Sequence, residues 1–158
     1  MSDAYEIRQA GPGDARAIRA LTREAYAKWV PLIGREPLPM SADYEEALKS
    51  HRFDLLFDAG ELIALIETIP HPDHLLIENV AVSPARQGEG LGRLLIDGVE
   101  RLAVALGHAE IRLYTNKLFA ANLTFYDKLG YRVAHEEEYR GGVVVHMAKA
   151  LSEPDPVS

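Results

Sequence analysis

The most informative absence in this chain is cysteine, which occurs nowhere in its 158 residues. Without cysteine the chain can form no disulfide, no thiolate metal site and no cysteinyl acyl-enzyme intermediate. No apolar run approaches the roughly 18 residues of a membrane-spanning helix. The first residues lack the basic start and apolar core of a signal peptide. These absences predict a cytoplasmic protein with no membrane partner.

Positive charge is scarce as well, because 17 Lys and Arg residues face 24 Asp and Glu residues, for a net charge of −7. This surplus of negative charge argues against a nucleic-acid partner. His71 and His74 have a metal-like spacing but flank a Pro-Asp turn without a third ligand nearby, so we expect no metal site. Length and composition predict one globular domain over residues 5–151, with a disordered tail at residues 152–158.

Hydrophobic periodicity and turn residues predict elements in the order β-α-α-β-β-β-α-β-α-β-β. The expected strands are residues 5–9, 52–57, 61–69, 74–82, 109–115, 131–139 and 143–150. The expected helices are residues 14–29, 43–49, 90–106 and 116–129, with residues 30–40 as a loop and Asn116 as the cap of the last helix. For the helix over residues 90–106, the expected buried stripe is Leu91, Leu94, Leu95, Val99, Leu102 and Leu106. Strand–helix–strand order in the second half requires a parallel pair, so the fold class is α/β (α+β) with a mixed sheet.

The most informative stretch is a glycine-rich turn that leads from the strand over residues 74–82 into the helix over residues 90–106. Gly88, Gly90 and Gly92 stand at alternate positions there. Glycine permits positive φ and has no Cβ, so several amide N–H groups can converge at a helix N-terminus, where the helix dipole favours an anion. The pattern therefore predicts a phosphate-binding turn.

Two common phosphate motifs do not fit this turn. A P-loop ends in Lys-Ser or Lys-Thr, whereas Arg93-Leu94 follow the last glycine here. A dinucleotide-binding motif spaces its glycines differently and places an acidic residue at the end of the next strand, which residues 109–115 lack.

The pattern Gln87-x-x-Gly90-x-Gly92 closely resembles the acetyl-CoA motif of the GNAT superfamily of N-acyltransferases. A second stretch, which begins at Asn122-x-x-x-Tyr126 and continues to Leu-Gly-Tyr, resembles the other signature of that family, and the order of elements matches its fold over residues 5–151. The resemblance implies acetyl-CoA as co-substrate and two strands that splay beside the pyrophosphate turn. The cofactor-binding residues that it implies are Val80, Ala81, Val82, Gln87, Gly88, Glu89, Gly90, Leu91, Gly92, Arg93, Asn122 and Tyr126.

The implied reaction is transfer of an acetyl group to a primary amine of a small molecule, an amino acid or a peptide or protein. Since no cysteine is available, the amine would attack the thioester directly in a ternary complex. The resemblance places the Tyr126 hydroxyl near the sulfur, where a phenol with a pKa of ~10 can return a proton to a thiolate with a pKa of ~8.5. Glu78 is the expected base, because strand alternation puts it on the face of Val80 and Val82. A solvated or salt-bridged strand residue is an equal alternative for Glu78.

The acceptor end is specified less sharply. By resemblance, Tyr26, Trp29, Arg35 and Tyr44 lie in the segment that lines the acceptor groove. Arg35 could bind a carboxylate of an amino acid or peptide end, or it could be a plain surface arginine. A non-catalytic acyl-CoA sensor or partner-binding module on the same scaffold is the alternative function, and a homodimer is left open.

Overall fold

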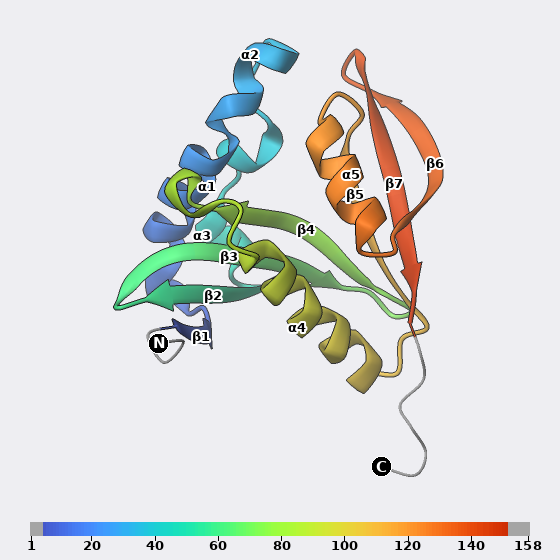
Figure 1. The fold of residues 1–158 in the computed structure, drawn as a ribbon. Coiled ribbons are helices and arrows are strands. Elements are labelled where there is room, and N and C mark those ends of the chain that lie inside the picture. The colour runs from blue at the N-terminus through green and yellow to red at the C-terminus, as the bar shows by residue number, and fades with distance from the viewer. Residues whose placement is uncertain (1–4, 152–158) are drawn as a thin grey trace.

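A seven-stranded mixed sheet forms the centre of the computed structural model, which describes residues 5–151 (Figure 1). The strand order is β1-β2-β3-β4-β5-β7-β6. The strands are β1 Tyr5–Gln9, β2 Arg52–Asp58, β3 Glu61–Pro70, β4 Leu75–Val82, β5 Glu110–Asn116, β6 Arg132–Tyr139 and β7 Gly142–Ala150. Only β4 and β5 run parallel, and the expected hairpins β2–β3 and β6–β7 are present. The expected mixed sheet with one parallel pair is confirmed.

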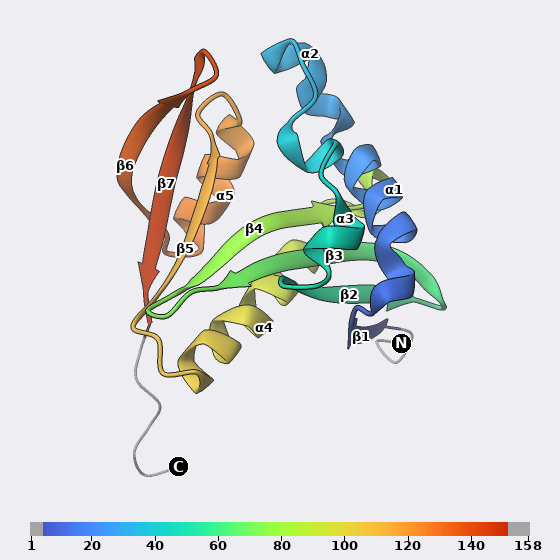
Figure 2. The same ribbon diagram turned by 180° about the vertical axis from the view of Figure 1, so that it is seen from behind.

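Helices cover both faces of β3 and β4, as the two opposite views show (Figures 1 and 2). They are α1 Ala15–Tyr26, α2 Val30–Ile33, α3 Tyr44–Ala47, α4 Leu91–Ala105 and α5 Ala120–Lys128. Ala64 and Ile66 of β3 pack beneath α4, whereas Leu65 between them packs beneath α1. Two apolar cores, one on each side of the sheet, therefore hold the fold together. Within residues 5–151, no helix is long and apolar enough to cross a bilayer.

The loop expected at residues 30–40 is wrong in part, because α2 and a 3-10 turn at Leu38–Met40 lie within it. The helix expected over residues 14–29 ends at Tyr26 and continues as a 3-10 turn at Ala27–Trp29. Pro31 stands in the first turn of α2, where its missing N–H is not needed.

The buried stripe expected for α4 is wrong at two positions. Leu94 and Leu106 are 39% and 55% exposed, while Ile96 and Ala103 are fully buried. The buried residues Leu91, Leu95, Val99 and Ala103 are spaced four apart along one side of the helix, and Ile96 lies beside this row. Leu106 follows the last residue of the helix, Ala105. The position of a residue in this i, i+4 row therefore predicts its burial better than the size of its side chain does.

The last helix begins later than expected. α5 starts at Ala120, and Asn116 is instead the last residue of β5. The side chain of Asn116 accepts a hydrogen bond from the backbone N–H of Leu118 at 2.9 Å. Asn116 therefore stabilises the turn after β5 and does not cap α5.

Candidate functional site

The two parallel strands of the sheet separate near its centre. They pair at only three positions, of which Ile77 opposite Leu113 is the last. Beyond that point β4 continues beside β3, whereas β5 continues beside β7 as far as Asn116 (Figure 2). Residues 80–82 consequently have no strand neighbour on the β5 side. The splayed strands that the family resemblance implied are present.

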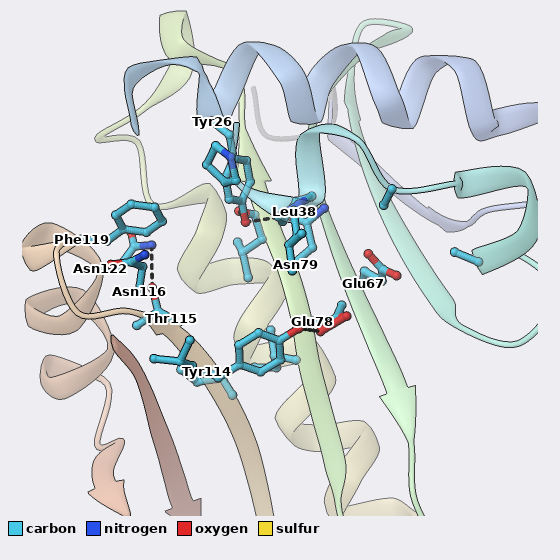
Figure 3. Close-up of a pocket in the computed structure, with 18 of the residues that line it drawn as sticks. Tyr26, Leu38, Glu67, Glu78, Asn79, Tyr114, Thr115, Asn116, Phe119 and Asn122 are labelled. Carbon is cyan, nitrogen blue, oxygen red and sulfur yellow. Dashed lines mark hydrogen bonds between the residues drawn. The ribbon is translucent and has the colours of Figure 1, made fainter. Parts of the chain in front are cut away.

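A β-bulge in β4 sets which side chains face this gap. In the register with β3, Glu67 lies opposite Asn79 and Thr68 lies opposite Ile77, so Glu78 has no opposing residue. Ile77 and Val80, three positions apart, both pack into the core beneath α4. Glu78 and Asn79 therefore both project toward the other face (Figure 3). The expectation that Glu78 shares a strand face with Val80 and Val82 is wrong, because the bulge breaks strict alternation.

The gap opens into a cavity of about 420 Å³, whose wall includes residues from the chain between α1 and β2, from the middle strands and from α5. Of the expected site residues, those that line it are Tyr26, Arg35, Tyr44, Glu78, Val80, Asn122 and Tyr126. Trp29 does not line this cavity. Its ring instead stacks on Phe119, which does, with ring centres 4.3 Å apart. Trp29 therefore acts as a packing contact between the end of α1 and the start of α5.

The glycine turn lies at the start of α4, where the sequence predicts a phosphate-binding turn. Gly88 and Gly90 have φ of 85° and 82°, in the left-handed region, and no side chain caps the helix at Gly90. The first N–H groups of a helix have no acceptor within it, so those of residues 91–93 are available to an anion. Gly92 does not fit the expectation of a positive φ, because it lies in α4 with ordinary helical geometry. A Cβ at Gly92 would lie 3.5 Å from Phe125 and 3.8 Å from Val80, which is normal contact.

Side chains tie the turn to the rest of the molecule. Arg86 contacts Asp58 at 2.9 Å and Glu89 at 3.1 Å, and the hydrogen bond to Glu89, followed by that to Asp58, raises the pKa of its guanidinium. The positive charge of Arg86 is thus balanced by the carboxylates of Asp58 at the end of β2 and Glu89 in the turn. Gln87 donates to the carbonyl of Val82 at 3.3 Å and accepts from Lys28 at 3.3 Å, so it links the end of β4 to the segment after α1.

Tyr126 provides an unpartnered hydroxyl at the cavity. The residue is 8% exposed, and its hydroxyl has no hydrogen-bond partner among residues 5–151. Burial raises the pKa of Tyr126, so the phenol stays protonated near neutral pH. Asn122 lies one turn earlier on α5, and its amide makes a long contact of 3.4 Å to the hydroxyl of Thr115. Both α5 residues can therefore donate to a ligand.

Glu78 and Tyr114 form a pair across the gap (Figure 3). The Tyr114 hydroxyl donates to Oε1 of Glu78, and both side chains line the cavity. Burial raises the pKa of Tyr114, and the hydrogen bond to the carboxylate of Glu78 raises it further. Glu78 is therefore held by a protein partner and is not a freely solvated strand residue.

Sequence reasoning missed two polar groups in the cavity. Oε2 of Glu67 lies 2.6 Å from Nδ1 of His51, and Glu67 is only 4% exposed. Burial raises the pKa of Glu67, although the hydrogen bond from His51 opposes that shift. Asn79 is buried and accepts a hydrogen bond from the Tyr26 hydroxyl at 2.7 Å. For Glu67 a signal existed, since it is the only charged residue between Leu62 and Ile69.

Comparison with known proteins identifies the family. Residues 16–131 match the model of the acetyltransferase (GNAT) family. This chain belongs to that family. Among curated relatives, a mycothiol acetyltransferase of Nocardia farcinica is 36% identical over 78 residues, which are 49% of this chain and 24% of that protein. The chain thus spans about a quarter of this relative's length.

Solved structures of GNAT-type enzymes share the fold. A PaiA N-acetyltransferase of Thermoplasma acidophilum in complex with coenzyme A superposes with a TM-score of 0.79 at 20% identity, over 92% of this chain and 98% of that one. A ribosomal-protein alanine N-acetyltransferase of Escherichia coli gives a TM-score of 0.79 at 20% identity, over 96% and 97% of the two chains. At this identity the likeness establishes the fold alone.

Proposed function

We propose that this protein transfers an acetyl group from acetyl-CoA to a primary amine, by direct attack of the amine in a ternary complex. Membership of the GNAT family supports this function. The single observation that carries it is the unpartnered Tyr126 hydroxyl, which borders the cavity where β4 and β5 separate. A non-catalytic sensor would need no such group.

The residues around the gap fit the cofactor. The glycine turn and the first turn of α4 offer several main-chain N–H groups without a side-chain competitor, and these suit a pyrophosphate. The backbone of residues 80–82 has no strand on the β5 side and can pair with the amides of a pantetheine chain. Asn122 can bind the same chain from α5. Bound there, acetyl-CoA supplies the activated thioester.

Two proton movements fall to this chain. A lysine-like amine must first lose its proton, at a cost of about 4.6 kcal/mol near pH 7. Glu78 has one carboxylate oxygen not engaged by Tyr114 and can accept this proton directly or through a water. Tyr126 can donate its hydroxyl proton to the departing sulfur, and main-chain N–H groups of β4 can polarise the carbonyl as the tetrahedral centre forms.

The test is a measurement of thiol release from acetyl-CoA with a panel of amines. We expect Tyr126→Phe to lower kcat by roughly 10²–10⁴-fold while coenzyme A still raises the melting temperature. Tyr131→Phe is the matched control, because Tyr131 is also a buried tyrosine but donates to Glu100 at 2.8 Å and does not line the cavity. Equal kcat values for Tyr126→Phe and the unaltered protein would reject Tyr126 as the acid. Binding of coenzyme A without turnover of any amine would favour the sensor.

A further inference from the structure

Two carboxylates that line the cavity each use only one of their two oxygens in contacts with the protein. Glu67 of β3 and Glu78 of β4 both line the cavity (Figure 3). Glu67 uses Oε2 to contact His51, and Glu78 uses Oε1 to accept from Tyr114. The other oxygen of each carboxylate has no hydrogen-bond or ion-pair partner among residues 5–151.

The free oxygen of Glu67 is not fully enclosed by protein, so a ligand in the cavity can reach it. The side chain of Glu67 is only 5% exposed, and a buried carboxylate is stable only when it is paired and fully hydrogen-bonded. Burial raises the pKa of Glu67 against the opposing hydrogen bond from His51, and the negative charge of Glu78 raises it further. No Lys or Arg of the described chain forms an ion pair with either residue. A cation from a ligand would add a permanent counter-charge to the contact with His51, which is charged only when protonated.

The rest of the cavity agrees with a cationic ligand of small size. Asp43 and Glu46 also line it, and Arg35 is the only Lys or Arg in its described lining. Apolar side chains such as Leu38 and Leu113 provide walls that suit a methylene chain. The volume of about 420 Å³ falls in the range typical of small-molecule sites.

We propose that the acceptor is a small aliphatic amine with a second cationic group, a diamine or polyamine, whose remote ammonium binds to Glu67. The reacting amine would then lie nearer to Glu78 and Tyr126, which are the proposed base and acid. Glu67 would select the substrate through its charge and would take no part in the proton transfers. This inference rests on the proposed acetyl transfer for its reaction, but it can be tested by binding alone.

The experiment compares cadaverine with pentylamine as acceptors, because the two differ in essentially one terminal ammonium. Their reacting amines have similar pKa values, so the ratio of kcat/KM reports the second charge. We expect cadaverine to be preferred by roughly 10–100-fold, the usual effect of a hydrogen bond to a charged group. Glu67→Gln, which keeps shape and removes charge, should bring the ratio of kcat/KM to near one, because cadaverine loses more than pentylamine does.

A second variant guards against an indirect effect of the Glu67 substitution. Ser50 is exposed and lines the cavity next to His51, so Ser50→Lys adds an ammonium there without disturbing the core. This variant should also lower the preference for cadaverine. A matched Ser50→Gln variant should retain it.

Several results would overturn the inference. Equal use of the two amines by the unaltered protein would do so, as would an undiminished preference in Glu67→Gln. Faster turnover of a free amino acid or of a peptide N-terminus would point to Arg35 and a carboxylate-bearing acceptor instead. If no amine is acetylated, the proposed function fails. Binding of the diamine to Glu67 is then tested separately, by melting temperatures measured in the presence of coenzyme A. Cadaverine must stabilise the unaltered protein more than it stabilises Glu67→Gln.

Discussion

Alanine substitutions at two glycines of the same turn should have opposite effects on stability. Gly90 has a φ of 82°, and a Cβ there would meet no atom within 4 Å, so only the backbone opposes Gly90→Ala. An L-residue in the left-handed region costs about 1–2 kcal/mol. Gly92 has helical geometry, and a Cβ there would lie in ordinary contact with Phe125 at 3.5 Å. Since alanine favours a helix over glycine by roughly 0.5–1 kcal/mol, Gly92→Ala should stabilise the protein.

The assay is thermal unfolding of each variant without coenzyme A. With a shift of roughly 2–4 °C per kcal/mol for a protein of this size, Gly90→Ala should lower the melting temperature by about 2–8 °C. Gly92→Ala should raise it by about 1–4 °C. Gly88, with a φ of 85° and open space around it, should behave like Gly90, whereas Gly13, with no positive φ and equally open space, serves as the neutral control. Similar losses of stability at Gly90 and Gly92 would refute the distinction between a glycine required for its positive φ and a glycine in an ordinary helical conformation.

Two further predictions concern the core and the buried carboxylate. Ile96→Ala should lower the free energy of unfolding by about 2–5 kcal/mol, whereas Leu94→Ala, at a position 39% exposed, should change it by less than about 1 kcal/mol, as denaturant titration can measure. Glu67→Gln should raise the melting temperature near pH 7 but not below about pH 4. Because burial raises the pKa of Glu67 in the folded state, the unaltered protein loses stability as the pH rises above the unfolded value of about 4.3. An equal effect of Glu67→Gln at both pH values would show that this carboxylate is not strained by burial.

Local patterns in the sequence were sufficient to predict the glycine turn and the helix that follows it. Gly88 and Gly90 adopt the positive φ that their spacing suggested, and α4 begins directly after them. The order of strands and helices was predicted from local periodicity together with turn residues such as Gly107 and Gly130. The single parallel pair then follows from the crossover through α4. Each of these features depends on residues that are close together in the chain.

The acceptor side depends on contacts between distant segments, and there the sequence was a weaker guide. The bulge that turns Glu78 away from the face of Val80 arises from the register between β3 and β4. That register can be read only when both strands are paired. Trp29 had the aromatic character expected of a groove residue, but it found a stacking partner in Phe119, 90 positions later by the sequence numbering. Neither the bulge nor the stacking of Trp29 on Phe119 can be predicted from a short window of sequence.

Three incomplete interactions lie around one gap in the part of the chain that the structure describes. Residues 80–82 have no strand partner on the β5 side, the Tyr126 hydroxyl has no hydrogen-bond partner, and Glu67 is a buried carboxylate with one unpaired oxygen. The two side-chain features could each be removed by a common substitution, Phe for Tyr126 or Gln for Glu67, at a gain in stability of the free protein. Their presence together is expected where ligands complete the interactions. The unpaired backbone suits the amides of the cofactor, Tyr126 suits its sulfur, and Glu67 suits a cation on the acceptor. The acceptor therefore has to contribute positive charge as well as a nucleophile if all three features are to be satisfied in the same complex.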